Sequence, residues 1–201
     1  RVPVVLGLPE STMPDQLKAF SAAAASGGAT SLFHAVGLTP EAPTLEAAFH
    51  GKTTYETVEI TPAEVAQMRA RLNTGDTEKV DMVLMGCPHL SFQEIKEIAC
   101  GIEGKKVHEG TEFWIQTSHP IYELASLAGY VEVIEKAGAM LVRDTCLMEM
   151  EYNGIWRGKH FVTNSGKAAQ YAPAINGVKI TMADMAGCVE AAVTGKKPKE
   201  A

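Results

Sequence analysis

Residues 80–99 read VDMVLMGCPHLSFQEIKEIA, and this stretch decides the fold. Residues 80–85 form a nearly continuous apolar run, which is typical of a strand buried on both faces of a parallel sheet. Residues 86–89 interrupt the run. Ser91 and Glu94 then have the spacing of a helix-capping box, and apolar residues follow at helical period. The stretch therefore predicts a strand, a short loop and a helix.

Two cysteines follow predicted strands in the same way. Cys87 lies in the loop after the first strand, just before the helix, and Cys146 follows a strand expected at residues 139–142. In open α/β sheets, ligands bind at the carboxyl ends of the strands. We therefore expect both thiols at the edge of the sheet where ligands bind.

The rest of the chain alternates predicted strands with predicted helices, and Gly129 is expected to mark a break or close packing in the longest helix. This alternation predicts an α/β fold, with a doubly wound, mostly parallel sheet and helices on both faces. Strands are expected at residues 2–6, 31–36, 55–60, 80–85, 113–117, 139–142, 160–163 and 178–181. Helices are expected at residues 17–25, 45–49, 62–72, 91–99, 121–136, 168–173 and 182–194. Pro173 is expected to end the sixth of these helices.

The length of 201 residues allows one large domain or two small ones. We expect two small α/β lobes, at about residues 1–78 and 79–195, and a frayed tail at residues 196–201. The chain starts with Arg1 rather than methionine, and a strand is expected at once. These features indicate part of a larger protein, such as its C-terminal half.

The composition is that of a globular protein, with 46% hydrophobic and 21% charged residues. The formal net charge of -6 disfavours a nucleic-acid or membrane-surface partner, which would require a basic face. The sequence has no apolar run long enough to span a bilayer, and residues 1–10 lack the pattern expected of a signal peptide. We therefore expect a cytoplasmic protein. Its four cysteines form no CxxC pair, which argues against a disulfide framework.

The position of each cysteine separates packing thiols from candidate ligands. Cys100 and Cys188 lie on predicted helices among small residues, and we interpret both as packed thiols. Cys87 and Cys146 follow strands, where their thiolates would suit zinc or an iron-sulfur cluster. Two thiolates do not complete a tetrahedral site. The remaining ligands could be His89, Asp144, a substrate oxygen or a cysteine outside this chain.

Residues 164–167, Asn-Ser-Gly-Lys, form a polar loop at the start of a predicted helix. Helix amides and the ammonium group of Lys167 would both favour a carboxylate or a phosphate. The loop lacks the upstream glycine of a P-loop, so a nucleotide site is weakly supported, and a solvated turn is an equal alternative. Five histidines show no partner spacing and are interpreted as structural or surface residues: His34, His50, His108, His119 and His160.

Four segments together resemble the aconitase X family, specifically the C-terminal half of its large subunit or catalytic domain. Family members are hydro-lyases related to aconitase, and they bind an iron-sulfur cluster through three cysteines. Some dehydrate cis-3-hydroxy-L-proline, and archaeal members dehydrate 5-phosphomevalonate. The similarity covers nearly the whole chain. The segments are LFHAVGLTPEAPTLEAAF (32–49), VLMGCPHLSFQEI (83–95), MLVRDTC (140–146) and TNSGKAAQYAP (163–173).

The resemblance implies a role for each strand-end loop. Cys87 and Cys146 would be two of the three cluster ligands, and the third cysteine would lie in the half that precedes this chain. Lys167 would bind the acidic end of the substrate, with Asn164 and Ser165 beside it. Asp144 and Ser165 are the candidates for catalytic polar contacts near the cluster.

The cofactor implied by the resemblance is an iron-sulfur cluster. A 4Fe-4S cluster is favoured, because three thiolates leave one iron open as a Lewis acid. A 2Fe-2S cluster or mononuclear iron would use the same thiolates, so both remain open.

The resulting hypothesis is an iron-sulfur-dependent dehydratase of a small hydroxy acid. Cis-3-hydroxy-L-proline is the preferred substrate, because Arg143 and Lys167 are the only cations in the three strand-end loops and a phosphate would require more. The alternatives are 5-phosphomevalonate dehydration and a non-catalytic α/β module that assembles with a partner. The isolated chain is expected to be inactive without the N-terminal half of the large subunit and the small subunit or domain of the family.

Overall fold

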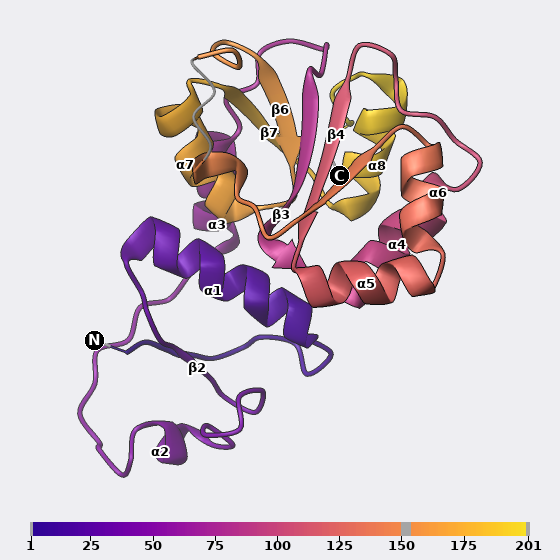
Figure 1. The fold of residues 1–201 in the computed structure, drawn as a ribbon. Coiled ribbons are helices and arrows are strands. Elements are labelled where there is room, and N and C mark those ends of the chain that lie inside the picture. Colours follow the sequence, from indigo (N-terminus) through magenta and orange to yellow (C-terminus); the bar gives the residue numbers. More distant parts are fainter. Residues whose placement is uncertain (1, 150–153, 200–201) are drawn as a thin grey trace. The chain divides into compact units, whose positions relative to one another are not determined.

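The computed structural model describes residues 2–149 and 154–199 (Figure 1). The chain divides into two compact units, residues 1–67 and residues 68–201. The division falls inside helix α3 (Pro62–Leu72), whereas the sequence places it near residue 78, after this helix. Within the described ranges, no helix is long and apolar enough to cross a membrane.

The first unit contains a two-stranded parallel sheet of β1 (Val4–Val5) and β2 (His34–Ala35). Helix α1 (Pro14–Gly28) connects the strands. It starts where the sequence places a proline, because a helix does not need the N–H of its first residue. The short helix α2 (Leu45–Ala48) follows, and the Thr44 hydroxyl caps it by accepting a hydrogen bond from the Ala47 nitrogen at 3.1 Å.

Two expectations for the end of this unit are wrong. Residues 55–60, predicted as a strand, have no regular structure, and Val58 and Ile60 are 83% and 74% exposed. A strand requires a partner for its backbone groups, and none of the described strands pairs with this segment. The apolar stripe predicted for α3 is also exposed rather than buried at Val65 and Met68.

The second unit is a five-stranded, fully parallel sheet with the strand order β5-β4-β3-β6-β7. Helices α4, α5, α6 and α8 contribute to the core on one face of the sheet, and α7 and the short 3-10 helix η1 contribute to the core on the other (Figure 1). This arrangement confirms the predicted doubly wound α/β fold. The strands are β3 (Met82–Leu90), β4 (Glu112–Thr117), β5 (Met140–Arg143), β6 (His160–Thr163) and β7 (Lys179–Met182). The helices are α4 (Phe92–Ile102), α5 (His119–Leu127), α6 (Tyr130–Lys136), η1 (Leu147–Glu149), α7 (Gly166–Asn176) and α8 (Met185–Thr194).

Strand β3 lies in the middle of this sheet and is buried on both faces. Val83 and Met85 belong to the core beneath α4 and α8, and Met82 and Leu84 belong to the core beneath α7. Successive side chains of a strand point to opposite faces, so a central strand needs apolar residues at every position. This requirement explains the unbroken apolar run in the sequence of β3.

The order of the strands reverses between β3 and β6. The sheet grows from β3 through β4 to β5 in one direction and from β6 to β7 in the other. In open parallel sheets, the crevice at the carboxyl side of such a reversal is where ligands bind. The loops that follow β3 and β6 flank this crevice.

The loop predicted at residues 86–89 lies inside β3 rather than after it. Met85 is paired with Ile115 and Leu90 with Thr117, so the register shifts between these two pairs. The intervening residues bulge out of the ladder, and the Thr117 hydroxyl donates to the Leu90 carbonyl oxygen at 2.8 Å where the pairing resumes. The sequence shows the interruption but not the resumed pairing, because the latter depends on β4.

Local signals at the helix ends are confirmed in two places and wrong in one. Ser91 and Glu94 form the predicted capping box of α4, and Gly129, at φ 81°, separates α5 from α6. Pro173 does not end its helix: α7 continues to Asn176. The hydrogen bond that a proline cannot donate is lost close to the end of this helix, and the nitrogen of Gly177 donates to the Pro173 carbonyl oxygen at 3.1 Å.

At the amino end of the sheet, the buried His160 joins several segments. Its Nδ1 is 2.9 Å from the Lys79 carbonyl oxygen and must be the donor there, and its Nε2 is 2.8 Å from the Thr181 hydroxyl oxygen. Nearby, Lys196 forms an antiparallel bridge with Lys79, within the segment predicted as a frayed tail. Residues 200 and 201 of that segment lie outside the described ranges. His160 is therefore structural, as the sequence suggests.

Gly86 provides a direct test of the bulge. Its φ is +104°, and an added Cβ would overlap the Gln116 carbonyl oxygen and lie 2.7 Å from the Gln116 nitrogen. We expect Gly86→Ala to lower the free energy of unfolding by roughly 2–5 kcal/mol, measured by urea denaturation. Gly129→Ala is the control, because its φ is also positive but no atom lies within 4 Å. It should cost roughly 1–2 kcal/mol. Equal losses would contradict the described contact between β3 and β4.

Candidate functional site

Cys87 and Cys146 lie at the carboxyl end of the sheet, as the sequence predicts. Both side chains are half-buried and pack against the core beneath α7. Burial raises the pKa of the Cys87 thiol, and the charge of Cys146 raises this pKa further. A hydrogen bond with Ser165 and the positive charge of Lys167 act in the opposite direction. Cys146, Ser165 and Lys167 therefore all lie close enough to Cys87 to influence its thiol.

Ser165 connects the loop after β6 to the loop that carries Cys87. It caps α7 by accepting a hydrogen bond from the Ala168 nitrogen at 3.0 Å, and its hydroxyl donates to the Cys87 carbonyl oxygen. Lys167 is the second residue of this helix, and Asn164 directly precedes the cap. The helix start and the Lys167 ammonium group thus lie beside Cys87, which is an arrangement suited to an anion.

His89 connects the two cysteine-bearing loops. Its Nε2 donates a hydrogen bond of 2.7 Å to the carbonyl oxygen of Thr145, the residue before Cys146. His89 is a candidate metal ligand from the sequence, but this hydrogen bond already occupies its Nε2 atom. It also holds the loop of Cys87 against that of Cys146, a positioning role that sequence reasoning missed. The only signal in the sequence is the closeness of His89 to Cys87.

Asp144 is placed at the start of α5. Its Oδ1 accepts a hydrogen bond of 2.8 Å from the His119 nitrogen, and its own nitrogen donates to the Thr117 carbonyl oxygen at 2.9 Å. Its φ is 51°, a conformation that aspartate adopts more readily than most residues. The carboxylate therefore orders the turn that leads from β5 towards Cys146. Within the described ranges, these hydrogen bonds of Asp144 join it to backbone groups and not to either thiol.

The described ranges 2–149 and 154–199 contain no group of three His, Cys, Asp or Glu side chains arranged to hold a metal ion. His89 and Asp144 do not form such a group with the two thiols. A third ligand from outside this chain, as the resemblance implies, remains a prediction.

Gln116 is a further polar residue at this edge, and sequence reasoning did not identify it. It lies near the end of β4, the strand between β5 and β3, and is only 2% exposed. Its amide nitrogen has no hydrogen-bond partner in the described part of the chain. Gly86 packs closely against its backbone and Cβ, and a larger residue there would overlap them. A buried donor without a partner fits an acceptor group bound at this edge.

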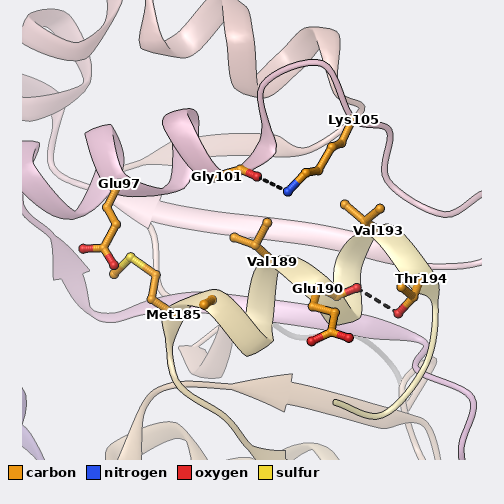
Figure 2. Close-up of a pocket in the computed structure, with 9 residues that line it drawn as sticks. Glu97, Gly101, Lys105, Met185, Val189, Glu190, Val193 and Thr194 are labelled. Carbon is orange, nitrogen blue, oxygen red and sulfur yellow. Dashed lines mark hydrogen bonds between the residues drawn. The ribbon is translucent and has the colours of Figure 1, made fainter. Parts of the chain in front are cut away.

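A separate groove of about 300 Å³ lies between α4 and α8 (Figure 2). Its floor is apolar, with Met185, Val189 and Val193 among its lining residues. Two polar groups drawn there form local hydrogen bonds: Lys105 donates to the Gly101 carbonyl oxygen at 2.7 Å, and the Thr194 hydroxyl donates to the Glu190 carbonyl oxygen at 2.8 Å. None of the predicted site residues lines this groove. Helices α4 and α8 cover the opposite face of the sheet from the core against which the cysteines pack.

Two models of known protein families match this chain. The family model for the aconitase X third domain matches residues 80–194, and the model for the aconitase X second domain matches residues 1–70. The chain belongs to the aconitase X family.

Two kinds of dehydratase are similar to this chain. Over 201 residues, the chain is 34% identical to a cis-3-hydroxy-L-proline dehydratase from Pseudomonas aeruginosa. This match covers 98% of the chain and 34% of that protein. Over 171 residues, the chain is 35% identical to the phosphomevalonate dehydratase large subunit from Methanocaldococcus jannaschii. This match covers 85% of the chain and 41% of that protein. The chain thus spans about a third to two fifths of the length of these relatives.

The fold agrees with a solved aconitase X structure. The holo-form of aconitase X from Thermococcus kodakaraensis superimposes with a TM-score of 0.82 at 29% sequence identity. The match covers 95% of this chain and 47% of that chain. The resemblance stated from four sequence segments is therefore confirmed, both in family and in fold.

The placement of the four cysteines predicts their order of alkylation. Cys100 is exposed and should react first with iodoacetamide, and the half-buried Cys87 and Cys146 should follow. Cys188 is buried, and burial strongly raises the pKa of its thiol, so it should react only after unfolding. Mass spectrometry of the labelled peptides over time measures this order. Early labelling of Cys188 would contradict the described packing of α8.

Proposed function

We propose that this chain forms part of an iron-sulfur-dependent hydro-lyase that removes water from a small hydroxy acid, with cis-3-hydroxy-L-proline as the first candidate substrate. The observation that supports this most strongly is the meeting of Cys87, Cys146 and Lys167 at the carboxyl edge of one parallel sheet. Two soft donors and a cation there suit a metal group with an anionic substrate beside it.

The residues present fit an iron-sulfur group in two respects. Cys87 and Cys146 supply thiol sulfur, the donor that iron-sulfur clusters use, and the orphaned amide nitrogen of Gln116 lies at the same edge. Cys87 and Cys146 would hold the group together with a third cysteine from outside this chain. When bound, an open iron would supply Lewis acidity for the departure of a hydroxyl group. We propose a 4Fe-4S cluster, with a 2Fe-2S cluster or mononuclear iron as alternatives on the same thiolates.

The chain's own residues would bind and orient the substrate. Lys167 and the start of α7 offer positive charge to a carboxylate, and Asn164 offers an amide. Ser165 is engaged with the Cys87 backbone, so we propose that it fixes the position of the thiol relative to the substrate. Asp144 is proposed as a polar group near the reacting atoms, through its position in the turn before Cys146.

A second candidate substrate is 5-phosphomevalonate. The named phosphomevalonate dehydratase large subunits are 30–36% identical to this chain, a range that includes the 34% of the Pseudomonas aeruginosa dehydratase. The anion site at Lys167 would accept a carboxylate or a phosphate. Arg143 is the only other cation of the three strand-end loops, and it packs on the Tyr122 ring, with its guanidinium carbon 4.6 Å from the ring centre. Among the described residues of these three loops, Lys167 is thus the one cation assigned to the anion site, which favours the proline derivative.

The proposed enzyme contains more than this chain. We propose that the N-terminal half of the large subunit supplies the third cysteine, and that a small subunit or domain completes the substrate site. The four cysteines, none of them in a disulfide, suit a cytoplasmic enzyme.

The test is water loss from both compounds by the intact protein that contains this chain, reconstituted anaerobically with iron and sulfide. Dehydration of cis-3-hydroxy-L-proline is the expected result. Lys167→Ala should lower kcat/KM by roughly 10- to 100-fold, because a charged hydrogen bond to the substrate is lost. Lys179→Ala is the matched control, since Lys179 starts β7 at the opposite edge of the sheet and should not affect turnover.

Each other outcome of this assay has a defined meaning. Dehydration of 5-phosphomevalonate alone would establish the second candidate. Turnover of neither compound, with a colourless protein after reconstitution, would contradict the dehydratase and support a non-catalytic assembly module.

A further inference from the structure

We propose that the side-chain amide of Gln116 donates a hydrogen bond to sulfur in the metal group held by Cys87 and Cys146, and so tunes the electronic properties of that group. This inference rests on the proposed function, because it requires such a group to be bound. It concerns a residue that the cysteine pattern of the sequence does not indicate.

The position of Gln116 follows from the order of the strands. Cys146 follows β5 and Cys87 lies in the bulge of β3, and β4 lies between these two strands. Gln116 is paired with Val142 of β5, and its backbone contacts Gly86 of β3, the residue before Cys87. It therefore lies in the intermediate strand between the residue before Cys87 and the part of β5 that leads to Cys146.

The direction of the Gln116 side chain follows from the alternation along β4. Phe113 and Ile115 belong to the core beneath α4, and Trp114 packs against the core beneath α7. Gln116 therefore shares the face of Trp114. Cys87 and Cys146 pack against this same core. The amide and the two thiols thus share both the edge and the face of the sheet.

The unpartnered amide nitrogen indicates that an acceptor is missing from this neighbourhood. A buried polar group without a hydrogen bond destabilises the folded protein, and nearly all such groups in native proteins have a partner. Because Gly86 presents no side chain, the loop of Cys87 packs directly against the backbone and Cβ of Gln116. An acceptor of negative charge, such as a thiolate or a sulfide bound to iron, would satisfy the donor at this place.

Hydrogen bonds to sulfur are among the ways in which proteins set the reduction potential of iron-sulfur groups. A donor withdraws electron density from sulfur and stabilises the reduced form. Loss of the donor should therefore make the potential more negative, even when the metal content is unchanged.

The experiment compares Gln116→Met and Gln116→Glu in the intact protein, reconstituted anaerobically with iron and sulfide. Methionine keeps a similar volume without a donor, and glutamate keeps the shape while replacing the N–H groups with oxygen. We expect both variants to have a more negative reduction potential than the unaltered protein, with the larger shift for glutamate, and an altered visible absorption band. Spectroelectrochemical titration measures both, and iron analysis reports the loading.

Thermal unfolding of the iron-free protein adds a second readout, in which the Gln116→Met variant is expected to be more stable than the unaltered protein. Gln116→Met removes the buried orphan donor, and its melting temperature should rise by roughly 2–4 °C. Asn176→Leu is the matched control, because the side-chain oxygen of Asn176, in the last residue of α7, is also buried without a partner in the described ranges. It should raise the melting temperature likewise and leave the reduction potential unchanged.

The outcomes separate this inference from the proposed function. If the unaltered protein binds iron and sulfide but both Gln116 variants keep its potential and spectrum, the role of Gln116 is refuted and the dehydratase proposal stands. If the unaltered protein binds no iron, the dehydratase proposal fails and the role of Gln116 fails with it.

Discussion

The parallel pairing of β3 with β4 on one side and β6 on the other is the constraint on which the site depends. Parallel strands end at the same edge, so pairing in register brings residues that are far apart in sequence to one place. Cys87 and Cys146, which are 59 positions apart (146 − 87), meet there because only β4 separates their strands. Ser165 and Lys167 join them because β6 pairs with β3 on the other side.

Burial and charge oppose each other at this edge. The environment that shields Cys87 from water favours its neutral thiol, whereas Lys167 and Ser165 favour the thiolate. A metal ion would displace the thiol proton and compensate the burial of the sulfur, because metal coordination requires the deprotonated form. Without a metal, the orphaned amide of Gln116 remains a costly feature of the sheet. Such features are typical of functional rather than structural sites.

The sequence predicted those parts of the fold that local patterns determine. The apolar run of β3, the Ser91 cap and the break at Gly129 follow from side-chain periodicity and backbone preference within a few residues. The strand expected at residues 55–60 and the end of α7 at Pro173 were wrong, because both depend on partners beyond the segment itself. The same contrast between local patterns and distant partners applies to the site. Cysteine positions indicated the sheet edge, but the contacts of His89 and Gln116 depend on which strands lie side by side.

The central claim is that Cys87 and Cys146 bind the same metal group. X-ray absorption at the iron edge tests it most directly, in the intact protein and in its Cys87→Ser and Cys146→Ser variants, with the exposed Cys100→Ser as control. The account predicts that each of the first two variants replaces one sulfur neighbour of iron with oxygen or loses iron, while the control matches the unaltered protein. Unchanged sulfur coordination in both variants would contradict it.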